Sequence, residues 1–184
     1  EEIARAIRAA DWKGAKDTTL TLHAIGRYDR VVLIGVGDGL AGKADLRDWG
    51  GRLAAASAAG APATIVAALP DAADVTDDAT QVATGYRLRS YAWGKVGKRA
   101  TPDPKRVVRL LAPRATDAAP ALADADAVAG GVSLARDLIS TPSNIKTPEF
   151  FVAETRTAFA GLPVDITVFD EAQMARMGMG GMIG

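Results

Sequence analysis

The sequence predicts an α/β protein with a mainly parallel sheet flanked by helices. Segments with strand and helix patterns alternate along the chain, and alternating elements form such a sheet because each connecting helix packs on one of its faces. In addition, 48% of the residues are hydrophobic. A chain of 184 residues can bury about 70% of the surface that it exposes when unfolded. A change of pattern after residue 118 adds the start of a second domain.

The first 118 residues supply the elements of the predicted sheet. Residues 18–23 alternate between polar and apolar side chains, which indicates a strand. Residues 31–36 are an uninterrupted apolar run, typical of a strand buried on both faces. The other predicted elements are a helix with an apolar stripe at 3–10, an Ala-rich helix at 46–59, a strand at 64–69, a helix at 77–93 capped by Asp77 or Asp78, and a strand at 106–111.

A long helix follows, because apolar residues recur every three or four positions. They are Leu122, Ala125, Val128, Val132, Ala135 and Leu138. Pro142 ends this helix, and residues 140–148 form a polar connection. Thr147 is predicted to cap the next helix, with Pro148 at its first position. A strand at 163–169 and a short helix at 170–177 complete the predicted order.

Both ends of the sequence suggest a piece of a longer protein. It begins at Glu1 without a Met, and residues 178–184 are apolar and rich in Gly, as expected of a chain entering another buried strand. We therefore predict an N-terminal α/β domain over residues 1–118, a linker helix and connection over 119–147, and the beginning of a C-terminal domain over 148–184.

Composition excludes several classes of function. The chain has no Cys, which excludes disulfides, thiol catalysis and zinc fingers. It has one His, His23, so a site with several His ligands cannot form. The 22 basic and 22 acidic residues give zero net charge, which argues against nonspecific nucleic-acid binding by the whole chain. No apolar run approaches the roughly 20 residues of a membrane span, and no signal peptide is visible.

A Gly-rich loop follows the apolar run at 31–36. Gly37, Gly39 and Gly42 match the dinucleotide-binding pattern G-x-G-x-x-G, and Gly37, Gly42 and Lys43 match most of the phosphate-binding pattern G-x-x-x-x-G-K-[ST]. A strand before the loop and a helix after it would leave backbone N–H groups free to hold phosphate. The loop is therefore a candidate nucleotide site.

Three residues weaken this interpretation. Ala44 stands where a Mg²⁺-binding hydroxyl is required, and Asp38 inside the loop would repel phosphate. Asp71, the acid that follows the next strand, lies too far along the chain for the ribose-binding position. We therefore favour a plain strand-to-helix turn and keep nucleotide binding as an alternative.

Few other side chains could carry chemistry. His23 could act as a general base, but no nucleophile motif accompanies it, and a structural or surface role is favoured. Asp77 and Asp78 are better explained as a helix cap. Asp124 and Asp126 diverge by about 200° around a helix, so they cannot share one metal ion.

A basic segment over residues 86–109 is a candidate phosphate-contacting face, because aromatic side chains are interleaved with its cations. Its basic residues are Arg87, Arg89, Lys95, Lys98, Arg99, Lys105, Arg106 and Arg109. Asp103 is its one acidic residue, and Tyr86, Tyr91 and Trp93 are its aromatics. The alternative is a solvated helix end and loop, where cations favour the helix C-terminus.

Residues 131–151 resemble the linker of the leucyl aminopeptidase (cytosol aminopeptidase) family. There, a helix ending in A-R-D-L, here at residues 135–138, is followed by T-P-x-N and then T-P-E, here at 141–144 and 147–149. Further on, residues 164–171 and 177–181 are similar to that family's strand and its G-M-G segment. The resemblance is close over residues 131–181 and looser over the whole chain.

The resemblance implies a macro-like N-terminal domain, a linker helix and a C-terminal peptidase domain. It implies a cytoplasmic, hexameric metallopeptidase with two divalent ions, Zn or Mn, that hydrolyses N-terminal residues, often Leu, from peptides. The family's catalytic residues and metal ligands match no position here, so we assign no catalytic, metal or cofactor-binding residue and expect residues 1–184 alone to be inactive. Some bacterial members also bind DNA, which draws attention to the basic segment at 86–109. The alternative is a free-standing macro-like module that binds nucleotide or ADP-ribose at the Gly-rich loop, or DNA through the basic segment.

Overall fold

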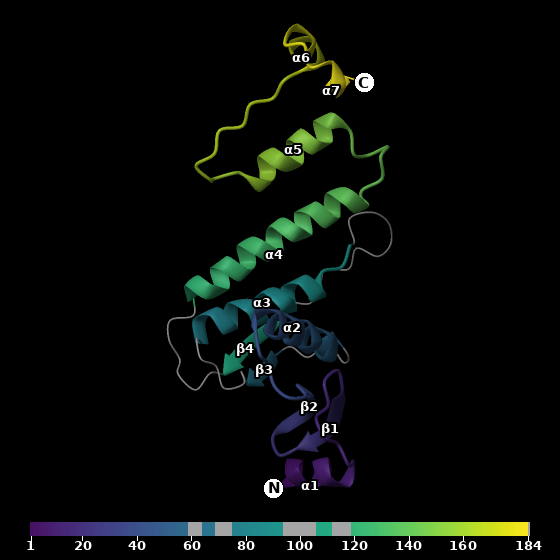
Figure 1. Ribbon diagram of the computed structural model, residues 1–184, viewed down its shortest axis with the longest axis vertical. Helices are drawn as coiled ribbons and strands as arrows, with labels where there is room; N and C mark the ends of the chain where they lie inside the picture. The colour runs from purple at the N-terminus through teal and green to yellow at the C-terminus, as the bar shows by residue number, and fades with distance from the viewer. Residues whose placement is uncertain (59–63, 69–74, 94–105, 112–118, 184) are drawn as a thin grey trace. The chain divides into compact units, whose positions relative to one another are not determined.

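The computed structural model describes residues 1–58, 64–68, 75–93, 106–111 and 119–183 (Figure 1). It divides into two compact units, Glu1–Arg136 and Asp137–Gly184. The elements in chain order are α1 (Glu2–Ala9), β1 (Thr19–Ile25), β2 (Tyr28–Ile34), α2 (Lys43–Ala58), β3 (Thr64–Ala68), α3 (Val75–Ser90), β4 (Val107–Leu111), α4 (Ala119–Ser140), α5 (Pro148–Ala158), α6 (Glu171–Arg176) and α7 (Gly180–Ile183). The predicted α/β class is confirmed, whereas the macro-like detail stays a prediction.

β1 and β2 form an antiparallel hairpin, with Thr19 opposite Ile34 and Ile25 opposite Tyr28. Gly26 starts the tight turn at a φ of 56°, a left-handed conformation that glycine adopts without strain. The strand predicted at 31–36 instead spans Tyr28–Ile34, and the residues of this strand are exposed or half-buried rather than buried on both faces. A two-residue connection can join only antiparallel strands, so this pair departs from the expected parallel arrangement.

β3 and β4 are the parallel pair that the alternating pattern predicts. Thr64 lies opposite Val107 and Ala68 opposite Leu111. α3 lies between them in the chain, as a parallel connection requires. Ile65 is buried on one face of this pair, and the alternating burial along β3 shows that only that face meets the core.

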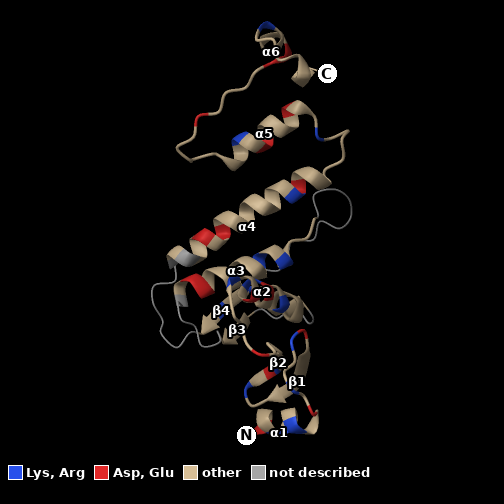
Figure 2. Ribbon diagram, in the orientation of Figure 1, with Lys and Arg blue, Asp and Glu red and all other residues tan. Residues whose placement is uncertain are grey.

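Helix α3 carries charged residues of opposite sign at its two ends. Asp77 and Asp78 lie in its first turn, and Arg87 and Arg89 lie in its last turn (Figure 2). Each sign opposes the partial charge of the helix end beside it, which stabilises the helix. The prediction that Asp77 or Asp78 is the cap is wrong, because the helix already begins at Val75.

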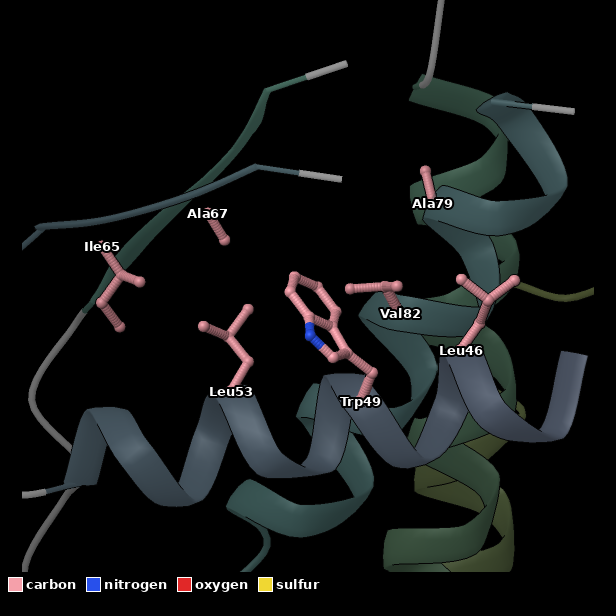
Figure 3. Close-up of a cluster of buried hydrophobic side chains, with 7 residues drawn as sticks. All are labelled: Leu46, Trp49, Leu53, Ile65, Ala67, Ala79 and Val82. Carbon is pink, nitrogen blue, oxygen red and sulfur yellow. The ribbon is translucent and has the colours of Figure 1, made fainter. Parts of the chain in front are cut away.

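The core of the first unit lies between α2, α3 and β3 (Figure 3). Its buried side chains are Leu46, Trp49, Leu53, Ile65, Ala67, Ala79 and Val82. Trp49 is 7% exposed and points from α2 toward the side chains of the other two elements. Burying a large apolar side chain contributes about 1.5–3 kcal/mol, so this cluster is the main source of stability for the unit.

α4 confirms the predicted long helix, which ends at Ser140, just before Pro142. Its buried face differs from the predicted stripe, however. Ala125 is fully buried and Ala129 is also buried, whereas Leu122 and Val128 are exposed. The two buried positions are thus alanines four residues apart on one face of the helix.

The second unit begins within α4 and continues through α5, α6 and α7. Thr147 caps α5 as predicted, since its hydroxyl oxygen accepts a hydrogen bond from the Phe150 N–H at 3.3 Å. Asp170 and Gln173 form a reciprocal capping box at the start of α6. The predicted division at 118 and 147 remains a proposal.

Two predictions fail in this unit. The strand predicted at 163–169 is absent, and the segment runs between α5 and α6 with no strand beside it in the part of the chain that is described (Figure 1). The apolar, Gly-rich end of the chain does not form a strand over its described residues either, since Gly180–Ile183 form the short helix α7. An alternating sequence can favour a strand, but hydrogen bonds from a partner strand are needed to form it.

Candidate functional site

The Gly-rich loop lies between β2 and α2, as predicted, and its backbone is tightly held. Gly37 and Gly39 have φ values of 61° and 124°, which side-chain-bearing residues rarely adopt. The Gly37 N–H donates to the Gly14 oxygen at 3.0 Å, and the Gly39 N–H donates to the Val36 oxygen at 3.2 Å. A Cβ on Gly35 would lie 2.1 Å from the Ala15 oxygen, so the preceding loop presses directly on this one.

A carboxylate of the protein itself accepts a hydrogen bond from the loop. One oxygen of Asp45, in the first turn of α2, accepts the Ala41 N–H at 3.3 Å, and the other accepts a hydrogen bond from Lys16 at 2.9 Å. The hydrogen bond from Lys16, with its positive charge, lowers the pKa of Asp45, and the same contact raises the pKa of Lys16. The loop therefore already holds an anion.

Lys43, the cation of the phosphate-binding pattern, is also engaged. Its ammonium lies 3.0 Å from one oxygen of Asp77 and 3.2 Å from the other, joining the start of α2 to the start of α3. The hydrogen bond from Lys43 lowers the pKa of Asp77. Arg47 donates to Gln81 one turn further along both helices. The arrangement supports a structural turn and gives no support to nucleotide binding.

The sequence did not reveal these pairs. Arg52 pairs with Asp17 and donates to the Gly35 oxygen at 3.4 Å, which ties α2 to the loop before β1. Asp45 could have been suspected from its place in the first turn of a predicted helix. Nothing in the spacing indicates that Lys16 is its partner, because 29 residues separate them.

The remaining candidates do not come together. His23 is exposed on β1, opposite Arg30. Asp126 pairs with Arg87 at 2.5 Å, and Asp124 is exposed. Asp38 is exposed in the loop, and Ala44 offers no hydroxyl. Over the described ranges, no three His, Cys, Asp or Glu side chains are grouped as a metal site would require.

The basic segment is partly neutralised. Arg87 is paired with Asp126, and Arg136 of α4 stacks on Tyr91, with its guanidinium 5.4 Å from the ring centroid. Arg89 and Arg109 are exposed. Arg106 is half-buried. Lys95, Lys98, Arg99, Asp103 and Lys105 lie outside the described residues, as does Asp71 of the nucleotide hypothesis. None of the described helices is both long enough and apolar enough to span a membrane.

Comparison with solved structures shows the fold. The structure is similar to a mutant of tomato leucine aminopeptidase, with a TM-score of 0.79 and 19% identity over 96% of this chain and 36% of that one. It is also similar to the bottromycin maturation enzyme BotP in complex with Mn, with a TM-score of 0.77 and 23% identity over 96% and 37% of the two chains.

Comparison of sequences shows the family. The chain is 33% identical over 189 residues to a probable cytosol aminopeptidase of Xanthobacter autotrophicus, and this alignment covers 99% of this chain and 38% of that protein. A probable cytosol aminopeptidase of Bradyrhizobium is also 33% identical, in an alignment that covers 100% of this chain and 38% of that protein. The chain thus spans about 38% of the length of these relatives. A model described as "Cytosol aminopeptidase family, N-terminal domain" matches residues 1–96, and the chain therefore belongs to the cytosol aminopeptidase family.

Proposed function

We propose that this chain is the N-terminal part of a metal-dependent leucyl aminopeptidase, which hydrolyses N-terminal residues from peptides. One observation carries the proposal: 33% identity to a probable cytosol aminopeptidase extends over 99% of the chain. The identity therefore includes the linker and the segment after it, beyond the matched N-terminal domain at 1–96. We propose the same three parts as from the sequence: a domain over 1–118, a linker over 119–147 and the beginning of a peptidase domain over 148–184.

The described residues do not fit a metal centre of their own. Two adjacent divalent ions need several carboxylates directed at one point. Asp45 and Asp77 instead pair with the cations Lys16 and Lys43. No grouping of three potential ligands occurs in the part of the chain that the structure describes. We therefore assign no catalytic or metal-binding residue and expect residues 1–184 by themselves to have no peptidase activity.

The further properties of the parent protein are part of the same proposal. Two Zn or Mn ions, a peptide substrate, a homohexamer and a cytoplasmic location follow from the family resemblance. A complex with Mn among the structural neighbours supports metal dependence. The two-unit division supports a chain that combines one compact domain with the beginning of another.

The test is a leucine-anilide assay on the longest product of the gene that encodes this chain. We expect hydrolysis that requires Mn²⁺ or Zn²⁺, is abolished by EDTA and returns when metal is added back. Residues 1–184, purified in the same way, are the matched control and should show no metal-dependent hydrolysis. A longer product that is folded but has no chelator-sensitive activity would overturn the proposal.

A further inference from the structure

The middle of helix α4 carries two adjacent glycines, Gly130 and Gly131. They lie inside one continuous helix of 22 residues (Figure 1). Glycine destabilises a helix interior more than any residue except proline, because its backbone has the most freedom to lose. The pair therefore makes this the point at which the interior of α4 opens most easily.

Neither packing nor backbone conformation requires glycine at these two positions. Both residues are exposed, and a Cβ on either would have no described atom within 4 Å outside its own stretch of helix. Neither is among the glycines with a positive φ. Gly50 and Gly85 differ, since a Cβ there would lie 2.1 Å or less from the backbone of the neighbouring helix. No contact in the described chain thus offsets the destabilising effect of the pair.

The part of α4 before the glycines is held in place by burial and by an ion pair. Ala125 is fully buried, and Ala129 is 4% exposed. Asp126 pairs with Arg87 of α3 at 2.5 Å. This half of the helix is therefore fixed within the first unit.

The part of α4 after the glycines is attached differently, through the side chain of Arg136. The guanidinium donates to the Leu88 oxygen at 2.9 Å and lies 5.4 Å from the centre of the Tyr91 ring. Leu88 lies in the last turn of α3, where carbonyl groups lack helical partners and a cation is favoured. Residues 130–140 are all described, and none of them is buried. The attachment can therefore open without exposing a core.

We propose that α4 is hinged at Gly130–Gly131 and that the contact of Arg136 with Leu88 and Tyr91 holds the helix straight. In the open state this contact and the backbone hydrogen bonds across the two glycines are broken. Residues 132–140 then move as a helical segment, while residues 119–129 stay in place. Sharp bends in helices form at such glycine positions because no Cβ restricts the backbone. This motion does not depend on the proposed aminopeptidase activity.

The decisive measurement is amide hydrogen exchange along α4, resolved residue by residue, in the longest product of the gene that encodes this chain. In a helix the amides of residues 131–135 bond to the carbonyl groups of residues 127–131, so these bonds lie at or across the hinge. We expect exchange at 131–135 to be at least about tenfold faster than at both 124–129 and 136–140, since local opening exposes these amides alone. Uniform exchange, or exchange that rises steadily toward Ser140, would overturn the hinge.

Replacing both glycines tests the hinge itself. Gly130→Ala combined with Gly131→Ala should slow exchange at 131–135 by at least about tenfold, because alanine favours the helix. The protein should still fold, since the added Cβ atoms would meet no described atom within 4 Å. Loss of folding or a lower melting temperature would show that a close contact requires the glycines, and the hinge would then be wrong.

A matched pair of variants tests the contact made by Arg136. Arg136→Lys should speed exchange at 131–135 several-fold and leave exchange at 124–129 unchanged, because a lysine cannot make both contacts. Asp126→Asn removes an exposed ion pair from the part of α4 before the glycines and should leave exchange at 131–135 unchanged. No effect of Arg136→Lys, or equal acceleration along the whole helix, would contradict the assigned role of Arg136.

Discussion

A Cβ atom on Gly85 would lie 1.8 Å from the backbone oxygen of Arg47, so α3 contacts the backbone of α2 with no side chain between them. The reverse contact is nearly as close, since a Cβ on Gly50 would lie 2.1 Å from the Val82 oxygen. Two glycines, one on each helix, thus set the distance at which Trp49 and its neighbours pack.

Gly85→Ala should therefore destabilise the first unit. Overpacking costs about 1–3 kcal/mol, which exceeds the gain of about 1 kcal/mol from replacing a helical Gly by Ala. Gly51→Ala is the matched control on α2, because its Cβ would meet the Arg89 side chain at an ordinary 3.7 Å. Urea unfolding should show a loss of stability for Gly85→Ala and no loss for Gly51→Ala. Equal stability of the two variants would contradict the close approach.

The Lys16–Asp45 contact should make stability depend on pH in the acid range. The pKa of Asp45 lies below its ordinary value of 3.8 in the folded protein, chiefly because Lys16 donates a hydrogen bond to it. Its contribution to stability is thus complete above this value and is lost as the pH falls from there through the lowered pKa. Asp45→Asn should flatten the acid part of a plot of unfolding free energy against pH. Asp48→Asn, an exposed change on the same helix, should leave that plot unaltered.

Arg136→Lys should weaken the attachment of α4 to α3. The guanidinium donates to the Leu88 oxygen at 2.9 Å and also lies over the Tyr91 ring. A lysine ammonium cannot reproduce both contacts, so we expect a loss of about 1 kcal/mol in urea unfolding. Asp126→Asn removes the exposed pair with Arg87 between the same helices and should cost at most about 0.5 kcal/mol. A larger effect of Asp126→Asn than of Arg136→Lys would reverse this ranking.

Nucleotides should not stabilise the chain. A ligand at 100 times its Kd raises the unfolding free energy by about 2.7 kcal/mol, which a thermal melt detects easily. We expect no change in Tm with millimolar ATP or ADP-ribose, because Lys43 is paired with Asp77 and Asp45 accepts the loop N–H. A rise in Tm that disappears in Lys43→Ala would restore the nucleotide-binding alternative.

Most helices and strands were predictable because their signals are local. Thr147 and Pro148 mark the start of α5, and Pro142 limits α4, since capping and ring geometry act within a few residues. The family resemblance was likewise readable from short motifs around residues 131–151. Burial was less predictable: Ala125 is fully buried while Leu122 is exposed, although both belong to the predicted apolar stripe.

The sequence by itself determined the α/β class, the order and approximate limits of the elements from α1 to α6 apart from the strand predicted at 163–169, and the family to which the chain belongs. Only the tertiary structure decided that the Gly-rich loop is held by Asp45 and Lys16, and that Lys43 is paired with Asp77. It also decided that residues 164–169 have no strand beside them in the described chain. The reason is physical: caps and periodicity depend on neighbours in sequence, whereas ion pairs and strand pairing depend on partners that only the folded chain brings near.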